Sequence, residues 1–146
     1  MSGGATSLSY VVTASVRAGG DASAVANGAT IPFDGTQGRV EGLPGPTDLL
    51  AAALSACILK NVERFSHLLT FRYESASVRV VADRTEPPPK IVRIRYELSV
   101  VTDETPVRLE LLHKNIRKFG TITNTLAGAC DLDGTIVAIA SEPSLG

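Results

Sequence analysis

The segment from Pro46 to Phe65 constrains the fold of this chain more than any other part of the sequence. A proline suits the first position of a helix, where its missing N–H would have no partner. Asp48 places a negative charge near the positive end of the helix dipole. Residues 49–59 are apolar on nearly every side of the predicted helix, which is typical of a buried helix. A chain of 146 residues has difficulty covering such a helix by itself.

The flanking segments predict strands and shorter helices. Strand-forming residues and the alternation of apolar and polar side chains indicate strands, and a proline after a threonine opens a second helix. The expected strands cover residues 8–16, 71–83, 90–100 and 134–140, with one or two short strands between 20 and 35. The other expected helices cover residues 105–116 and 121–127, and a long loop covers residues 35–46.

The separation of strands from helices predicts an α+β fold with a mostly antiparallel sheet. Residues 71–83 and 90–100 are expected to form a long antiparallel hairpin. The length is that of one domain, because domains most often contain about 100–150 residues. We therefore predict a single domain over residues 1–146, with an ordered core of about 8–140.

Charge and composition exclude several classes of partner and cofactor. Fourteen basic against fifteen acidic residues leave a net charge of −1, which gives no electrostatic basis for binding nucleic acid or an anionic membrane. Two cysteines are too few for a disulfide scaffold, so a reduced, cytoplasmic protein is expected. His67 and His113 lack neighbouring ligands and are expected to be capping or solvated groups. No nucleotide or zinc motif occurs, so no metal and no other cofactor is expected.

Cys57 is the candidate catalytic residue, and it lies on the apolar helix. A reactive cysteine needs a stabilised thiolate, but Cys57 lies beyond the first turn, where the helix dipole has faded. Lys60 and Arg64 share its helical face and are the nearby cations. The competing interpretation is structural, because a buried free cysteine behaves as a small hydrophobic residue. Cys130 precedes the last strand, and nothing in the local sequence pairs it with Cys57.

The loop before the apolar helix carries two charged candidates. Arg39 and Glu41 either reach a pocket at the start of that helix or form a solvated pair on the surface. Loops of this length without secondary structure are often functional.

The sequence Gly-Pro-Thr-Asp-Leu-Leu-Ala-Ala-Ala-Leu-Ser-Ala-Cys, residues 45–57, resembles the central helix of the OsmC/Ohr family. These are osmotically inducible and organic hydroperoxide resistance proteins. The order of the other elements agrees with the family from about residue 8 to residue 140. The resemblance implies an α+β homodimer of two intertwined chains, with sheets wrapped around two long central helices. It also implies that both active sites lie at the dimer interface.

The resemblance further implies a chemistry for Cys57. In the peroxidase members, one cysteine attacks the O–O bond of a hydroperoxide and becomes a sulfenic acid. A second cysteine condenses with it, and an external thiol reductant reduces the disulfide. An arginine and a glutamate hold the first cysteine as a thiolate. The matching arginine is Arg17 or Arg39, and Thr47, with Asp48 beside it, takes the position of the glutamate.

The chain departs from the family pattern at the second cysteine. Gly120 takes that position, and Cys130 lies ten residues later. A glycine supplies no sulfur, so the usual two-cysteine cycle is in question. If Cys57 is oxidised, either a small-molecule thiol or Cys130 must resolve it.

Three functions therefore compete. The first is thiol-dependent reduction of organic hydroperoxides, with apolar substrates selected by a pocket lined by Leu49, Leu50, Phe65 and Phe119. The second is a non-catalytic protein that binds a small apolar ligand at the dimer interface. The third is a protein whose loop 35–46 is the contact surface for a protein partner. The predicted site residues are Cys57 as the nucleophile and Arg39, Asp48 and Phe119 as binding residues.

Overall fold

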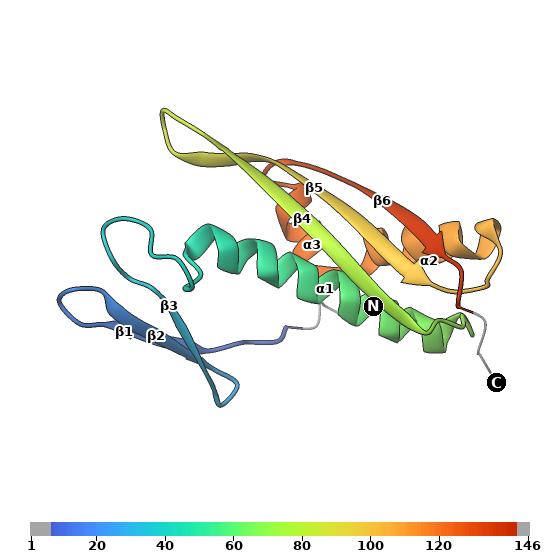
Figure 1. Cartoon of the computed structure of the whole chain (residues 1–146), viewed down its shortest axis with the longest axis horizontal. Helices are drawn as coiled ribbons and strands as arrows, with labels where there is room; N and C mark the ends of the chain where they lie inside the picture. The colour runs from blue at the N-terminus through green and yellow to red at the C-terminus, as the bar shows by residue number, and fades with distance from the viewer. Residues whose placement is uncertain (1–6, 143–146) are drawn as a thin grey trace, which may run out of the picture. The chain divides into compact units, whose positions relative to one another are not determined.

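The structure is a computed structural model that describes residues 7–142. The chain divides into two compact units, of which one ends at Leu49 and the other begins at Leu50. Helix α1, Pro46–Leu68, crosses this boundary. Figure 1 labels the helices and strands of both units. The predicted α+β class is confirmed, and residues 7–142 contain two sheets and three helices.

The first unit contains a three-stranded antiparallel sheet. Its strands, in spatial order, are β1 (Val12–Val16), β2 (Asp21–Ala26) and β3 (Ala29–Asp34). Asn27 and Gly28 have φ values of 48° and 79°, so a two-residue turn closes the β2–β3 hairpin. The strand predicted over residues 8–16 begins only at Val12, because its partner there, Ala26, is the last residue of β2.

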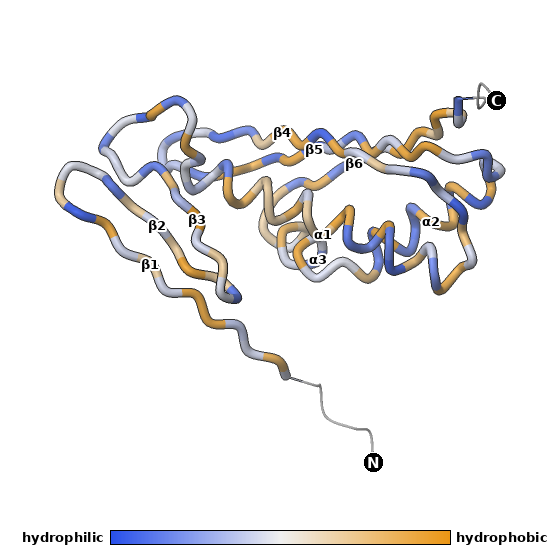
Figure 2. The backbone as a smooth tube through the Cα atoms, turned by 60° about the horizontal axis from the view of Figure 1, so that its bottom comes forward, coloured by the Kyte–Doolittle hydropathy of each residue, from blue (hydrophilic) through white to orange (hydrophobic). Residues whose placement is uncertain are grey.

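The second unit packs helices on one face of another three-stranded sheet, as Figure 2 shows. Its elements after α1 are β4 (Ser75–Thr85), β5 (Lys90–Val101), α2 (Pro106–Phe119), α3 (Thr121–Ala127) and β6 (Asp131–Ile139). Strands β4 and β5 form the predicted antiparallel hairpin, whereas β6 runs parallel to β5. Helices α2 and α3 supply the crossover that a parallel connection requires. Among residues 7–142, three of the four strand pairings are antiparallel, as predicted, and the last one, β5 with β6, is parallel.

The boundaries of the predicted elements shift by a few residues. Helix α1 continues to Leu68, and the following strand begins at Ser75 rather than at residue 71. The backbone N–H of Phe71 donates to the carbonyl of Ser66 at 2.9 Å, so this segment still terminates the helix. The last strand begins at Asp131, three residues before its predicted start.

The core of the second unit lies between α1, α2 and the sheet. Leu54, Ile58, Val62 and Phe65 form one buried stripe along α1, at the spacing of a single helical face. They pack with alternate residues of β5 and with one face of α2, namely Ile94, Tyr96, Leu98, Val100, Leu109, Leu112 and Ile116. Within the second unit, this packing covers one face of α1, and Leu50, Ala52 and Ala56 are exposed. Among residues 7–142, no helix has the length and hydropathy needed to cross a bilayer.

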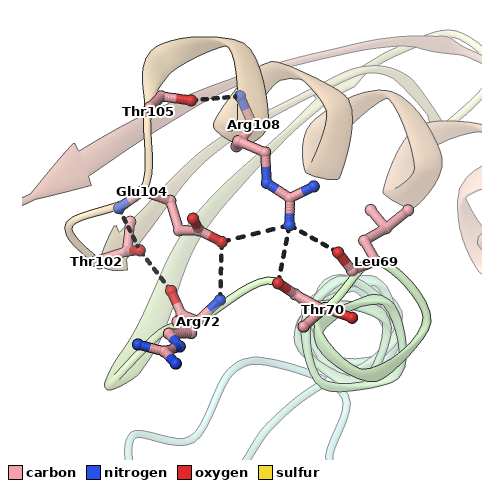
Figure 3. Close-up of polar contacts among 7 residues, drawn as sticks. All are labelled: Leu69, Thr70, Arg72, Thr102, Glu104, Thr105 and Arg108. Atoms are coloured by element: carbon pink, nitrogen blue, oxygen red, sulfur yellow. Dashed lines mark hydrogen bonds and ion pairs between the residues drawn. The ribbon is translucent and has the colours of Figure 1, made fainter.

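Arg108 at the start of α2 ties the end of α1 to the loop after β5 (Figure 3). Its guanidinium donates to the carbonyls of Leu69 and Thr70 at 2.6 and 2.8 Å and lies 3.5 Å from the carboxylate of Glu104. That carboxylate also accepts from the backbone N–H of Arg72 at 3.0 Å. A single cation therefore satisfies carbonyls at the negative end of α1.

Replacing Arg108 by methionine is expected to lower the free energy of unfolding by about 2 kcal/mol, because hydrogen bonds to charged groups contribute more than neutral ones. The Arg72→Met variant is the matched control, since Arg72 enters this network through its backbone. Urea denaturation of both variants measures the difference. Equal stabilities of the two variants would contradict this role of Arg108.

Candidate functional site

Cys57 lies in the middle of α1, between the buried residues Leu54 and Ile58, and is itself half-buried. Its thiol is free. Asn61 follows one turn later and is buried, with 8% of its surface exposed. The side-chain nitrogen of Asn61 donates to the backbone carbonyl of Cys57 at 2.9 Å and lies 3.7 Å from the Cys57 sulfur. Asn61 was not among the site residues predicted from the sequence, although its i, i+4 spacing from the cysteine was a usable signal.

The cations that were expected near Cys57 are exposed on α1. The guanidinium of Arg64 lies over the ring of Phe65, 5.3 Å from its centroid. Arg64 therefore stacks on an aromatic ring in the structure. Lys60 shares the exposed side of the helix.

Phe65 and Phe119, both predicted to line a substrate pocket, lie together. Their ring centroids are 5.7 Å apart with an interplanar angle of 37°. Phe65 is buried, whereas 45% of Phe119 is exposed at the end of α2. Lys118 places its ammonium 5.3 Å from the centroid of the Phe119 ring. The pair thus forms an aromatic contact between α1 and α2 with one ring reaching the surface.

Gly120 joins α2 to α3 and has little room for a side chain. A Cβ atom there would lie 2.7 Å from the hydroxyl oxygen of Thr123 and 3.1 Å from the carbonyl of Ile116. The Thr123 hydroxyl is buried without a hydrogen-bond partner. A cysteine at position 120 would therefore require Thr123 to move.

Cys130 is free and half-buried, after α3. Its thiol lies 3.5 Å from the carbonyl oxygen of Leu126, to which it donates a weak hydrogen bond. This contact is local and involves no other candidate residue.

Arg39 and Asp48, two of the predicted binding residues, form a two-point ion pair within the first unit. Their nitrogen–oxygen distances are 3.0 and 3.3 Å. Asp48 also accepts from the backbone N–H of Gly45 at 2.9 Å. The hydrogen bonds from Arg39 and then from Gly45 hold the pKa of the Asp48 carboxyl below its usual value. Arg39 thus pairs with the helix start rather than with its loop neighbour Glu41.

Asp34 organises the same loop from its other end. Its carboxylate accepts from the hydroxyl and the backbone N–H of Thr36, at 2.6 and 2.9 Å, and from the backbone N–H of Val40 at 2.8 Å. These bonds, the Thr36 hydroxyl first, lower the pKa of the Asp34 carboxyl. The loop that was predicted from its composition therefore has a defined conformation, held by carboxylates at both ends. The other arginine candidate, Arg17, lies in the exposed turn between β1 and β2.

A further polar cluster joins the end of α1 to the segment before β4. The Tyr73 hydroxyl donates to the carboxylate of Glu63, and His67 lies 2.8 Å from the other carboxylate oxygen. The Glu63 contact raises the pKa of Tyr73 to about 12, and the hydrogen bonds from Tyr73 and then His67 lower the pKa of Glu63. Both contacts are exposed, so we interpret the cluster as a solvated one. In the sequence, the i, i+4 spacing of Glu63 and His67 was the only sign of this cluster.

The prediction that both histidines are capping or solvated groups is wrong for His113. It is buried on α2, and its Nε2 lies 2.6 Å from the hydroxyl of Tyr96 on β5. Burial, followed by repulsion from Arg117, lowers the pKa of His113, which Glu110 partly offsets. The hydrogen bond between His113 and Tyr96 therefore lies inside the core and not at the surface.

The stability of the protein is expected to fall as the pH drops from 7 to 5. The pKa of folded His113 is below its ordinary value of 6.5, so the unfolded chain binds more protons in this window and stability rises with pH. Carboxylates such as Asp34 and Asp48 protonate only at lower pH. Urea denaturation at both pH values should show a smaller fall for His113→Gln than for the unaltered chain. An equal fall in both proteins would contradict this assignment.

The described residues also bear on metal binding. Within residues 7–142, no group of three histidine, cysteine, aspartate or glutamate side chains is placed to hold a metal ion.

Comparison with known proteins agrees with this fold. A family model described as OsmC-like protein matches residues 36–133. No curated protein matches the chain in sequence. The crystal structure of an OsmC-like protein from Mycoplasma pneumoniae matches with a TM-score of 0.81 and 16% identity, over 94% of this chain and 100% of that one.

Two organic hydroperoxide resistance proteins are similar in structure as well. The protein described as OsmC, from Legionella pneumophila, has 15% identity and a TM-score of 0.72, over 89% of this chain and 98% of that one. OhrB of Bacillus subtilis has 17% identity and a TM-score of 0.66 over the same shares, 89% and 98%. At these identities the likeness shows the fold.

Proposed function

Because this chain belongs to the OsmC-like protein family, we propose that it is a stress-response protein that reduces organic hydroperoxides through Cys57. Structural neighbours from Legionella pneumophila and Bacillus subtilis are named as organic hydroperoxide resistance proteins, which supports a role in the stress response. The site would lie around Cys57, on the helix whose Phe65 contacts the ring of Phe119. The expected location is the cytoplasm, where thiols are kept reduced.

The observation that carries this proposal is the setting of Cys57. A free, half-buried thiol lies on an apolar helix with a buried amide donor 3.7 Å from its sulfur. Apolar surroundings suit an organic hydroperoxide, and a hydrogen-bond donor suits a thiolate. Phe65 and Phe119 extend the apolar character toward the surface between α1 and α2.

The first step oxidises the sulfur by two electrons. The Cys57 thiolate attacks the terminal oxygen of the hydroperoxide, the S–O bond forms, and the O–O bond breaks. The alkoxide takes a proton and leaves as an alcohol, and Cys57 becomes a sulfenic acid. The peroxide is reduced by the two electrons that the sulfur loses.

An external thiol completes the cycle. One thiol molecule condenses with the sulfenic acid, which forms a mixed disulfide and releases water. A second thiol molecule attacks that disulfide, restores the Cys57 thiol and leaves as the oxidised reductant. Gly120 supplies no sulfur, and the Cys130 thiol bonds locally to Leu126, which favours this one-cysteine cycle over an internal disulfide.

We also propose that the active form is a homodimer. The apolar side chains before and in β1 are exposed, with 87% of Tyr10 and 80% of Val11 accessible. Leu50, Ala52 and Ala56 leave a second apolar face on α1 uncovered. A second copy of the chain would bury both surfaces. Sedimentation of the purified protein at micromolar concentration would test this, and a monomer would contradict it.

The function is tested with cumene hydroperoxide. The reduced protein should consume it with an excess of a small dithiol, and release cumyl alcohol in equal amount. Without dithiol, one equivalent of peroxide should oxidise Cys57, which mass spectrometry of the peptides would detect. Unmodified Cys57 in the folded protein would contradict the proposal.

A second candidate is a non-catalytic protein that binds a small apolar ligand at the dimer interface. The glycine at position 120, where the family pattern has a sulfur, favours it. A thermal shift with fatty acids that persists in Cys57→Ser, without any peroxide turnover by the unaltered chain, would support this alternative. No specific observation favours loop 35–46 as a surface for a protein partner.

A further inference from the structure

We infer that Asn61 positions the Cys57 sulfur and donates a hydrogen bond to it, first as a thiolate and then as a sulfenate. This inference rests on the proposed function, because it assigns a residue to the same site. The side-chain nitrogen of Asn61 lies within hydrogen-bond reach of that sulfur, at 3.7 Å.

The chemistry of the two groups fixes the orientation of the Asn61 amide. A backbone carbonyl only accepts hydrogen bonds, so the nitrogen and not the oxygen of the amide must face the carbonyl of Cys57, 2.9 Å away. The same nitrogen lies 3.7 Å from the Cys57 sulfur. A side-chain amide carries two hydrogens, so one can point to the carbonyl and the other to the sulfur.

The carbonyl of Cys57 does not by itself explain a buried asparagine. Within an α-helix that carbonyl already accepts the backbone N–H four residues later, which here is the N–H of Asn61. Ile58, Val62 and Phe65 around position 61 are apolar and buried, so a leucine would suit the stripe. Burying an amide there costs free energy unless it is hydrogen-bonded. The Cys57 carbonyl accepts one hydrogen of this amide, and the sulfur is an acceptor for the other.

A hydrogen-bond donor beside the Cys57 sulfur suits the negative charge that the sulfur carries during the reaction. The sulfur is negatively charged when it attacks the peroxide, and the sulfenate also accepts hydrogen bonds. A hydrogen bond to a charged acceptor is stronger than one to a neutral acceptor, so Asn61 favours the charged forms. Arg64 is turned toward Phe65, so the amide provides a donor that this cation does not.

The chain offers a matched control on α2. Asn115 makes the same side-chain bond to the carbonyl four residues before it, at 2.9 Å to Leu111, but the residue there has no sulfur. Replacing either asparagine by leucine removes an i, i−4 amide bond from a helix. Only the change at position 61 removes a donor from Cys57.

The test compares the rates at which Cys57 reacts in the intact protein at pH 7. Peptide mass spectrometry measures its alkylation by iodoacetamide and its oxidation by cumene hydroperoxide. Asn61→Leu should slow both reactions by about tenfold, as expected for losing a hydrogen bond to a charged group. Asn115→Leu should leave both rates within about twofold of the original, and all rates should coincide in urea.

A second variant keeps the test decisive if Asn61→Leu does not fold. Asn61→Asp preserves the size of the side chain but replaces the donor with a negative charge, so it should slow both reactions further. Alkylation of either folded variant at the original rate would overturn the role of Asn61. If the unaltered chain does not react with peroxide, the proposed function fails, while the alkylation rates still decide the role of Asn61.

Discussion

Replacing Gly134 by alanine is expected to lower the free energy of unfolding by about 3 kcal/mol. Gly134 on β6 is paired with Tyr96 on β5, and the Tyr96 ring covers it. A Cβ atom at position 134 would lie 1.9 Å from Cζ of that ring, so the ring must move. Tyr96 is buried, with 3% exposed, and its hydroxyl is paired with His113. The substitution therefore combines overpacking with a lost buried hydrogen bond.

Urea denaturation measures this effect, and two further variants control for it. Gly128→Ala adds the same methyl group where the nearest atom is 3.6 Å away, so it should change stability by less than about 0.5 kcal/mol. In a Tyr96→Ala background, the methyl group at position 134 should cost much less, because the ring is absent. A Gly134→Ala variant as stable as the original chain would refute the packing argument.

Replacing Cys57 by serine is expected to reduce peroxide turnover at least about a thousandfold, as removal of a catalytic nucleophile does. A hydroxyl has the shape of the thiol but does not form a comparable nucleophile at neutral pH. The rate of cumyl alcohol formation with excess dithiol measures the loss. The unfolding transition should change little, because only one half-buried atom is replaced.

Cys130→Ser separates the two possible cycles. If a small thiol resolves the sulfenic acid directly, this variant should retain the original rate within about twofold. Its thiol donates to the Leu126 carbonyl four residues away, which a serine hydroxyl can also reach. Loss of turnover in Cys130→Ser would contradict the one-cysteine cycle and make Cys130 the resolving thiol.

Local patterns predicted the elements of the second unit well. Pro46 and the apolar run after it indicated the central helix, and alternation along residues 90–100 indicated the strand that became β5. Thr105 and Pro106 marked the start of α2, where the Thr105 hydroxyl accepts from the backbone N–H of Arg108 at 3.2 Å. Such signals are local, because propensity and capping involve residues within one or two turns.

Contacts between distant residues were not predictable in the same way. The parallel pairing of β6 with β5 depends on the crossover through α2 and α3, and no alternation pattern distinguishes it from antiparallel pairing. His113 was expected at the surface, yet Tyr96 on another element gives it a buried partner. Arg39 was considered with its neighbour Glu41, but it binds Asp48 at the start of the helix.

The candidate site also combines features set by local sequence with features set by contacts between distant residues. The sequence alone determined that an apolar helix carries one cysteine near its middle, and that a glycine takes the place of a second one. Folding determines which face of that helix is buried, the contact of Phe119 with Phe65, and the crowding of position 120 by Thr123. The two kinds of feature differ because helix formation depends on residues close together in the chain, whereas packing depends on atoms that only folding brings together.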